Sequence, residues 1–349
     1  MVRQKVAVIF GGRSGEHEVS VKSARSVMAA LDHERWEVIP IAITRGGAWL
    51  GPDETGAGLR EGTAAFAGGS GGALTSTAAL QALAACDVAF PLVHGTYGED
   101  GTLQGFLEIA GLPYAGAGVA ASAIGMDKAL MKALFNQANV RGALYSVIRS
   151  WEYARDEMIA TKMIESYLGY PCFVKPANGG SSVGITRALS REDLPAAFAA
   201  AFAYDDKVVV EQAVHGHEVE CSVLGNEQPE ASVVGEVVPD REFYDYESKY
   251  SSSSHTELLI PAPLDPAVAE EVRELALRMY QVMGCEGYAR IDFFVTAEGV
   301  LANEVNTIPG FTSISMYPKL WEASGLPYGQ LLTRILELAF ERHERRSRR

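Results

Sequence analysis

Residues 290–310 read RIDFFVTAEGVLANEVNTIPG, and this stretch carries the strongest indication of fold and chemistry. Two apolar runs flank an acidic turn, which predicts a hairpin of two core strands. If the turn centres on Glu298, Asp292 faces Glu304. Asn306 then shares a strand face with Glu304, because side chains alternate with period two. Carboxylates at one depth in neighbouring strands repel each other unless a cation lies among them.

The oxygens of Asp292, Glu304 and Asn306 form a set that suits Mg²⁺. This ion needs few protein ligands and takes further oxygens from water and from substrate phosphates. The flanking residues are apolar and predict burial, and charged residues are rarely buried without partners. The hairpin therefore predicts a magnesium site, and the alternative is a solvated strand face that carries charges.

Composition limits the possible classes of protein. The 349 residues are enough for two or three domains, and 48% hydrophobic with 21% charged residues is typical of globular chains. A net charge of −14 argues against nucleic acid as a partner, because duplex binding requires phosphate-neutralising Lys and Arg. An acidic protein can still bind ATP, since a metal and a few local bases neutralise the phosphates.

Nothing in the sequence indicates export or a membrane. The four cysteines are scattered without a CxxC pair, so neither a zinc site nor a disulfide framework is predicted. The start MVRQKVAVIF lacks a signal-peptide pattern, and no apolar run reaches the ~18 residues of a membrane span. We therefore expect a cytoplasmic protein. The basic tail ERHERRSRR, residues 341–349, is expected to be a solvated, frayed end.

Apolar periodicity predicts an α/β domain followed by two mixed ones. Residues 5–10 form a strand that leads through a glycine turn into a helix, and 36–44 and 86–95 form further strands. The Gly- and Ala-rich residues 51–80 are expected to be a partly flexible surface insertion.

A central α+β block, roughly 123–216, is expected to carry helices from Asp127 to about Asn139 and over 158–168. In the third block we expect strands at 218–225 and 231–238, helices near 265–283 and 328–342, and the opening hairpin. Residues 239–261 form a long loop rich in Tyr and Phe. Its length and composition favour a functional lid over simple disorder.

Two glycine-rich stretches could approach phosphates. Residues 174–184, VKPANGGSSVG, place Lys175 at a strand end before a small-residue loop. It is not a Walker A loop, and an ordinary hairpin loop is an equal alternative. Residues 116–121 match G-x-G-x-x-A, but no acidic strand end follows about 20 positions later. A tight strand-to-helix turn is therefore favoured there.

Several charged residues follow predicted strands. Glu16, His94 and Glu99 lie after the C-terminal ends of strands, where open α/β sheets bind ligands, although helix capping explains such residues equally well. Glu211 and Glu218 flank a bend and could meet an adenosine, although a solvated hinge is the simpler explanation for each alone. No G-x-S-x-G elbow indicates serine chemistry.

Eight segments, in order along nearly the whole chain, resemble the D-alanine–D-alanine ligases of the ATP-grasp superfamily. They are GGRSGEHEVS (11–20), HGTYGEDGTLQG (94–105), MDK (126–128), VKPANGGSSVG (174–184), EQAVHGHEVE (211–220), FYDYESKY (243–250), RIDFF (290–294) and NEVNTIPGFTSIS (303–315). Each is weak alone, and together they are specific. Residues 51–80 lie outside the match.

The resemblance implies a three-domain ATP-grasp fold, α/β and α+β in class. The expected domains are a Rossmann-like domain over 1–122, a central ATP-grasp domain over 123–216 and a C-terminal one over 217–349 with its lid at 239–261. The implied reaction joins two D-alanines for peptidoglycan precursors. ATP phosphorylates the first carboxylate, and the second amine displaces phosphate from the acyl phosphate. A homodimer is expected, because relatives are commonly dimers.

The resemblance also implies roles for individual residues. Asp292, Glu304 and Asn306 would hold two Mg²⁺, with Mn²⁺ possible in their place. ATP would contact Lys128, Lys175, Gly180, Ser181, Ser182, Glu211, Val214, Glu218, Lys249 and Phe294. The D-alanines would contact Glu16, His94, Lys249, Ser315 and Met316. Glu16, Ser181, Tyr250, Arg290, Gly310 and Ser315 would carry the catalytic contacts, with Arg290 and the Gly310 N–H forming an oxyanion hole.

Some departures and alternatives follow from the same resemblance. Gln212 and Ala213 stand where relatives often have Lys and Trp beside adenine, and Met316 stands where Leu is common. Tyr250 favours D-alanine as the second substrate, because this loop reads differently in ligases that make D-alanyl-D-lactate or D-alanyl-D-serine. The alternatives are another ATP-grasp carboxylate–amine or depsipeptide ligase, and a nucleotide-binding module without turnover.

Overall fold

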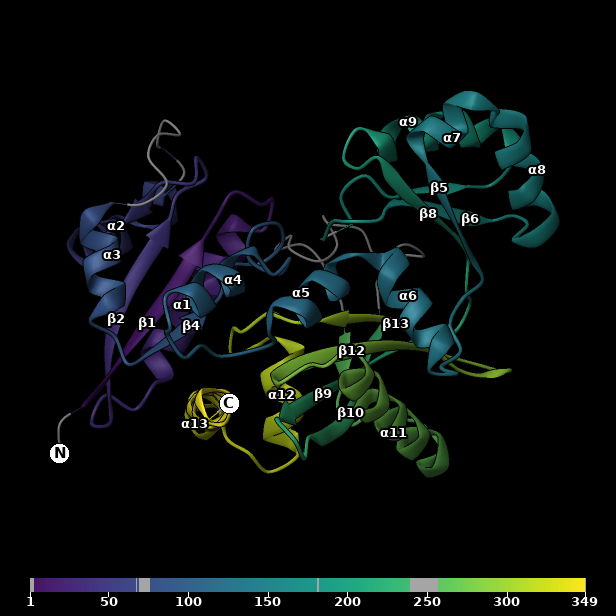
Figure 1. Ribbon diagram of the computed structural model, residues 1–349. Coiled ribbons are helices and arrows are strands. Elements are labelled where there is room, and N and C mark those ends of the chain that lie inside the picture. Colours follow the sequence, from purple (N-terminus) through teal and green to yellow (C-terminus); the bar gives the residue numbers. More distant parts are fainter. Residues whose placement is uncertain (1–2, 67, 69–75, 181, 239–256, 349) are drawn as a thin grey trace.

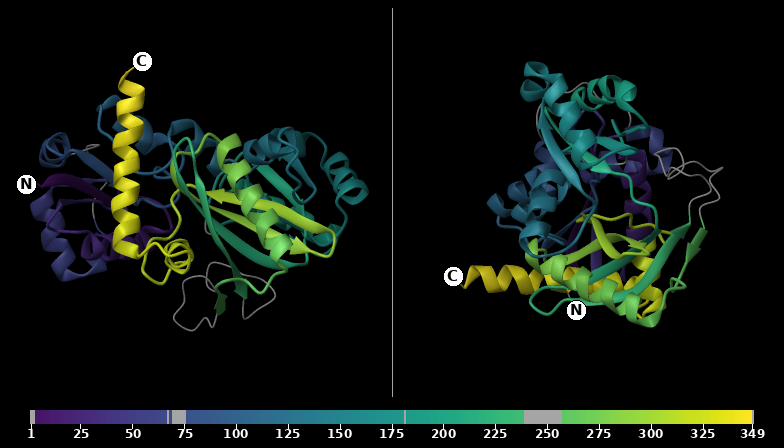
Figure 2. Two further views of the ribbon diagram at one scale, coloured as in Figure 1. Left: turned by 90° about the horizontal axis from the view of Figure 1, so that it is seen from below. Right: turned by 90° about the vertical axis from the view of Figure 1, so that its right-hand side faces the viewer.

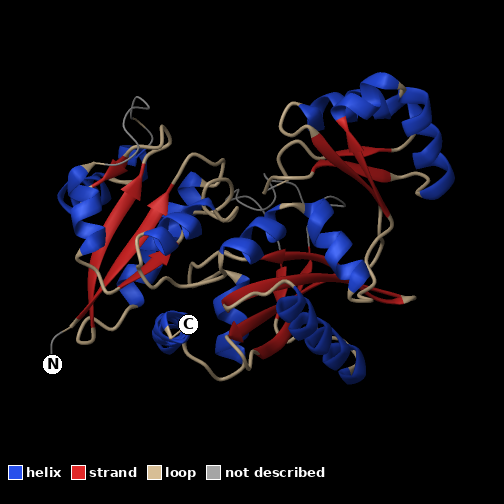
Figure 3. Cartoon of the chain, viewed as in Figure 1, coloured by secondary structure: helices blue, strands red, loops and turns tan. Residues whose placement is uncertain are grey.

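The computed structural model describes residues 3–66, 68, 76–180, 182–238 and 257–348 (Figure 1). Its strands form three sheets, ordered β3-β2-β1-β4, β5-β8-β6-β7 and β11-β10-β9-β12-β13. Each sheet and the helices packed on it form one layer. The three layers, N-terminal, central and C-terminal, lie around the middle of the molecule (Figure 3). Among the described residues, no helix is both long and apolar enough to cross a membrane.

The N-terminal sheet is parallel at its centre. It contains β1 (Gln4–Gly11), β2 (Trp36–Ile43) and β4 (Val88–Pro91) in parallel, with the short β3 (Trp49–Leu50) antiparallel at one edge. Alternate residues of β1 pack on opposite faces, as period two requires. One face packs with α1 (His17–Ala30), and the other with α3 (Thr77–Ala84) and α4 (Thr102–Ile109).

The stretch predicted to be a partly flexible surface insertion, residues 51–80, contains regular and packed structure over 52–66. These residues form α2 (Pro52–Glu61) and the 3₁₀ turn η1 (Thr63–Phe66). Phe66 is fully buried, with its ring edge-on to Phe10 at 5.6 Å. The helix begins with Pro at its first position, where the ring's fixed φ suits a helix start. The Gly and Ala content obscured this signal.

The central sheet is antiparallel and is covered by helices on one face (Figure 1). Its strands are β5 (Tyr145–Arg149), β6 (Cys172–Pro176), β7 (Thr186–Ala188) and β8 (Lys207–Gln212). The covering helices are α7 (Ser150–Arg155), α8 (Glu157–Tyr167) and α9 (Leu194–Phe202), preceded by the 3₁₀ turn η2 (Arg191–Asp193). The helix expected at 158–168 is thus confirmed to within a residue at each end.

The C-terminal sheet is also antiparallel. It contains β9 (His217–Gly225), β10 (Glu230–Val238), β11 (Glu257–Leu259), β12 (Gly287–Thr296) and β13 (Gly299–Asn306), with helices α11 (Pro266–Val282) and α12 (Met316–Ala323). The expected hairpin is confirmed, with Asp292 opposite Glu304. The turn is centred between residues 297 and 298, because Thr296 pairs with Gly299, whereas the prediction centred it on Glu298. A bulge after Asp292 then shifts the pairing and brings Asp292 opposite Glu304.

Helices α5 (Val119–Met126) and α6 (Lys128–Gln137) connect the first and second sheets along the chain. The Asp127 carboxylate caps α6 by accepting from the N–H groups of Ala129 and Leu130, which confirms the predicted helix start. Met131 and Phe135 of α6 pack in one apolar cluster with the C-terminal sheet. The domain bounds at 122/123 and 216/217 remain a prediction, and this packing draws α5 and α6 towards the third block.

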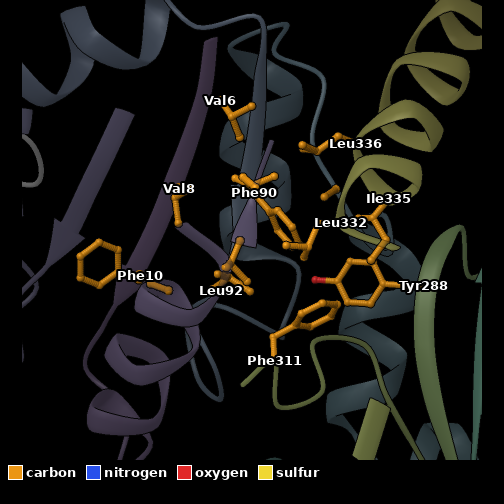
Figure 4. Close-up of a cluster of buried hydrophobic side chains, with 14 of the residues drawn as sticks. Val6, Val8, Phe10, Phe90, Leu92, Tyr288, Phe311, Leu332, Ile335 and Leu336 are labelled. Carbon is orange, nitrogen blue, oxygen red and sulfur yellow. The ribbon is translucent and has the colours of Figure 1, made fainter. Parts of the chain in front are cut away.

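The N-terminal and C-terminal layers share one hydrophobic core. Figure 4 shows Phe90 of β4 and Leu92, which follows this strand, facing Tyr288, Phe311 and helix α13 (Tyr328–Ser347). The Phe90 ring lies 6.2 Å from Tyr288 and 5.7 Å from Phe311, both edge-on, as aromatic quadrupoles prefer. These two layers therefore form one packed body.

The prediction of a frayed basic tail is wrong as far as Ser347. Helix α13 continues through it (Figure 2), and Arg342 is buried with its guanidinium donating to the carbonyls of Tyr114 (2.6 Å) and Gly116. Arg345 and Arg346 both pair with Glu286. These basic residues connect the end of the predicted first domain to the predicted third domain. The basic composition of the tail alone could not indicate such contacts.

Truncating Phe90 tests the shared core. Phe90→Ala should lower the free energy of unfolding by about 3–5 kcal/mol, because it opens a cavity between two layers that pack on each other. Urea unfolding measures the loss. Ile109→Ala is the control, since Ile109 is 90% exposed, and it should change stability by less than about 0.5 kcal/mol. Equal effects of the two substitutions would contradict the shared core.

Candidate active site

A cleft of about 1010 Å³ lies where the three layers meet. Its wall includes Glu16, His94 and Glu99 of the N-terminal layer, the hairpin β12–β13, and Gly179, Gly180, Ser182 and Ile185 beside the central sheet. The predicted site residues that line it are Glu16, His94, Lys128, Gly180, Ser182, Glu218, Arg290, Asp292, Phe294, Glu304, Asn306, Gly310, Ser315 and Met316. Residues more than 290 positions apart in sequence thus line one cavity.

A row of carboxylates crosses the floor of the cleft. Asp292 on β12 is directly opposite Glu304 on β13 and also directly opposite Glu220 on β9. Like charges at opposed strand positions destabilise a sheet, so this row requires cations. Glu220 has no role in the sequence prediction. Its place could have been found from the alternation of 218, 220 and 222 in a strand that pairs with β12.

Arg290 supplies one of these cations. Its Nε donates to Asp292 Oδ1 and its Nη2 to Asp292 Oδ2, each at 2.8 Å, and its Nε lies 2.9 Å from Glu220 Oε2. Burial alone would lower the pKa of Arg290, but Asp292 and Glu220 outweigh it and hold that pKa well above its usual value. The guanidinium is therefore fixed in its charged form at the cleft floor.

The donor set of the hairpin fits a hard cation. Asn306 donates its amide to Asp292 Oδ2 (2.9 Å), and Asp292 Oδ1 keeps one lone pair beyond its bond to Arg290. Among the described residues, no three acidic, His or Cys side chains converge as a ready-made metal cage. Two carboxylates and an amide suit an ion that takes its other ligands from water and phosphate, as Mg²⁺ does.

Glu16 lies where two loops meet. A Cβ at Gly95 or at Gly180 would come within 2.9 Å of the Glu16 Oε2, so both loops approach this carboxylate through glycine. Glu16 is also the N-cap residue of α1, and its side chain makes no capping hydrogen bond. The capping alternative is therefore not favoured for Glu16, and the carboxylate lines the cleft.

His94 and Glu99 lie beside Glu16. His94 is buried, with Nδ1 2.9 Å from the Ile308 carbonyl and Nε2 3.2 Å from Ser23 Oγ. Burial lowers its pKa although Glu16 opposes the shift, so the ring is neutral. Burial and the nearby Glu16 raise the pKa of Glu99 to about 8, while its bond from the Gly95 N–H opposes this. This end of the cleft therefore disfavours a further negative charge.

Two predicted ATP contacts lie behind the cleft wall. The buried Glu211 carboxylate accepts from Lys175 at one oxygen and from Lys132 at the other. Burial works against its charge, but the two lysines outweigh burial and lower the pKa of Glu211 to about 2. Lys132 has no role in the sequence prediction. Its spacing of four residues from Lys128 on one helix was the available signal.

Lys128 lies nearer the cleft and donates to the Gly179 carbonyl at 2.6 Å. Ser315 also lines the cleft and precedes α12, and Thr312 donates its N–H to Ser315 Oγ (3.1 Å). A Cβ at Gly310 would lie 3.1 Å from the same oxygen. The Gly310 backbone, the start of α12 and Met316 thus form one corner of the cleft.

Some predicted residues are not placed by these observations. Ser181, Lys249 and Tyr250 lie outside the described residues, as does most of the predicted lid, of which only residues 257–261 are described. Val214 is described but does not line the cleft. The roles given to all four remain predictions.

Three layers enclose the cleft, and two of them contain antiparallel sheets. This arrangement, with carboxylates and a lysine in the cleft, defines the ATP-grasp class. Two family models match the chain: "D-ala D-ala ligase N-terminus" over residues 5–117 and "D-ala D-ala ligase C-terminus" over 134–337. Curated relatives named D-alanine–D-alanine ligase include those of Geobacillus kaustophilus (46% identical, 98% of this chain and 96% of that protein) and Thermoanaerobacter sp. strain X514 (47%, 100% and 99%). The chain belongs to the D-alanine–D-alanine ligase family.

Solved structures agree with the fold prediction. The D-alanine–D-alanine ligase of Coxiella burnetii matches with a TM-score of 0.82 at 34% identity, covering 99% of this chain and 96% of that one. The VanG D-Ala:D-Ser ligase of Enterococcus faecalis also matches with a TM-score of 0.82 at 34% identity, covering 97% and 100%. The predicted ATP-grasp fold is thereby confirmed.

The raised pKa of Glu99 predicts a pH dependence of stability. A carboxyl with a raised folded-state pKa stabilises fully below its unfolded value of 4.5, and this contribution is lost as pH rises towards about 8. As the pH rises from 5 to 8.5, the urea midpoint of the wild-type protein should therefore fall relative to that of Glu99→Gln. The variant keeps an acceptor for the Gly95 N–H. A difference between the two proteins that does not change with pH would contradict this.

Proposed function

We propose that this chain joins two D-alanines to D-alanyl-D-alanine with ATP, through an acyl phosphate, and so supplies peptidoglycan synthesis. The observation that carries the proposal is one cleft lined both by Glu16 and by the cluster of Arg290, Asp292 and Glu304. The first group suits the ammonium of an amino acid. The second suits phosphates and the charge of an acyl-transfer step.

ATP is proposed to lie between the central and C-terminal sheets. Lys128 and Lys175 would neutralise its phosphates, with Gly180, Ser181 and Ser182 covering them. Glu211, Val214, Glu218, Lys249 and Phe294 would surround the nucleoside. Support comes from Lys128, Gly180, Ser182, Glu218 and Phe294, which line one cavity. Phosphoryl transfer depends on such positioning more than on covalent help.

Asp292, Glu304 and Asn306 are the residues that would hold Mg²⁺, proposed as two ions with Mn²⁺ as a substitute. Bound there, the ions would offset the charge of the transferring phosphoryl group. Arg290 already donates to both oxygens of Asp292 and so offsets part of the charge that the ions would meet.

The remaining residues are proposed to orient the amino acids. Glu16 would hold the first ammonium, tied across the closed site to Ser181 and Tyr250, with His94 nearby. Ser315 and Lys249 would meet the second carboxylate, beside Met316. Arg290 and the Gly310 N–H would take the charge on the tetrahedral oxygen when the second amine attacks. The lid over 239–261 would exclude water, because an acyl phosphate hydrolyses readily.

The second substrate separates this proposal from its closest rival. The similar VanG protein of Enterococcus faecalis is a D-Ala:D-Ser ligase, so D-serine is a specific alternative for the second site. Tyr250 is the sequence feature that favours D-alanine. The dimeric state belongs to the proposal as well, and light scattering of the purified chain tests it.

Amino-acid-dependent ADP formation tests the proposed function. ATP with D-alanine alone should support turnover, whereas D-serine or D-lactate added at limiting D-alanine should contribute little mixed product. Product identity is read by mass spectrometry. Turnover only with L-amino acids or D-lactate would overturn the substrate assignment, and nucleotide binding without any ADP formation would favour the non-catalytic alternative.

Glu304→Gln tests the metal assignment. It removes one ligand charge while keeping shape, so kcat should fall by on the order of 10²-fold or more with the unfolding midpoint little changed. Glu298→Gln is the matched control, since Glu298 lies exposed in the turn of the same hairpin, and it should keep full activity. Undiminished turnover of Glu304→Gln would contradict the assignment.

A further inference from the structure

Three charged side chains form a buried group behind the cleft wall. Glu211 lies between Lys132 and Lys175, and each lysine bonds a different carboxylate oxygen. The group carries two positive charges and one negative charge in a place with little water. One lysine is enough to neutralise Glu211, so the second must have another reason to be there.

The two lysines are held differently. Lys132 rises from α6, its side chain is 6% exposed, and its ammonium lies 5.8 Å from the centre of the Tyr145 ring. Tyr145 is the cross-strand partner of Glu211, so Lys132 contacts two residues that lie opposite each other on neighbouring strands. Lys132 is therefore enclosed by its partners.

Lys175 is the more accessible of the two. It lies on β6, diagonal to Glu211 across the strand pair, and its side chain is 18% exposed against 4% for Glu211. Besides Glu211, the cleft carboxylates Glu304 and Glu218 act on its charge and help to raise its pKa against the effect of burial. Lys175 is thus the lysine that can turn towards the cleft.

We propose that Lys132 is a positioning residue: it keeps Glu211 paired and in place, so that Lys175 can leave Glu211 for the nucleotide phosphates. The inference rests on the proposed function, which gives Lys175 its phosphate role. Without Lys132, a departing Lys175 would leave a buried carboxylate unpaired. Lys175 would then stay on Glu211, and ATP would bind weakly.

Two other roles for Lys132 make different predictions. A direct phosphate contact would require Lys132 to reach the cleft. Neither lysine lines the cleft, and the Lys132 side chain is 6% exposed against 18% for Lys175, so Lys132 is the less able of the two to reach it. A purely structural bridge between α6 and β8 would affect stability and leave ATP binding alone. Binding measurements at equilibrium therefore separate the three.

The test measures ATP affinity by calorimetry without amino acid, together with steady-state kinetics. Lys132→Met should weaken ATP binding and raise the KM for ATP by about tenfold or more, with kcat and the KM for D-alanine changed less than threefold. Lys132→Arg should restore most of the affinity. Lys162→Met, at an exposed lysine of α8, is the matched control and should bind ATP like wild type.

A double variant shows whether Lys132 acts through Glu211. Adding Lys132→Met to Glu211→Gln should weaken ATP binding by less than twofold beyond Glu211→Gln alone, because no charge is left to neutralise. This variant also serves if Lys132→Met alone does not fold. A further loss of fivefold or more, or wild-type affinity of Lys132→Met, would overturn the proposal.

Lys175→Met distinguishes this inference from the proposed function. If it weakens ATP binding while Lys132→Met does not, only the role of Lys132 fails. If Lys175→Met binds ATP like wild type, its phosphate role fails and the inference fails with it.

Discussion

One electrostatic constraint governs the structure: a β-sheet carries a row of like charges, which destabilise it unless positive charge is near. Glu220, Asp292 and Glu304 stand opposite one another on three adjacent strands, and Arg290 lies among them. Burying this row is costly unless positive charge is supplied. Arg290 supplies part of that positive charge, and Lys128 lines the same cleft within electrostatic reach of Glu304.

Two kinds of contact hold the layers together, and they suit different mechanical roles. The N-terminal and C-terminal layers share an aromatic core closed by α13, which makes them one body. The central sheet meets α6 through polar pairs, Asp127 with Lys207 and Lys132 with Glu211, around a small apolar cluster of Ala129, Ala177 and Val209. Breaking either of these largely buried pairs would leave a charge uncompensated, so they hold α6 on the central sheet by charge rather than by a large apolar core.

Local patterns in the sequence predicted much of the fold, and the site followed from motifs. The hairpin register was predictable because period-two alternation and a short turn leave few choices. Helix α2 (Pro52–Glu61) was missed because Gly and Ala hid a Pro-started helix, and the ordered tail was missed because its partners Tyr114, Gly116 and Glu286 are remote in sequence. Glu220 and Lys132 were missed for the same reason, since their roles appear only when strands and helices from different parts of the chain meet.

The central claim is that the cleft activates a carboxylate by phosphoryl transfer. Turnover of D-alanine labelled with ¹⁸O in its carboxylate measures this directly, with the released phosphate and the dipeptide analysed by mass spectrometry. The account predicts one ¹⁸O transferred to phosphate for each peptide bond formed, because the acyl phosphate gives up a carboxylate oxygen when the amine attacks. Dipeptide formed alongside unlabelled phosphate would contradict it.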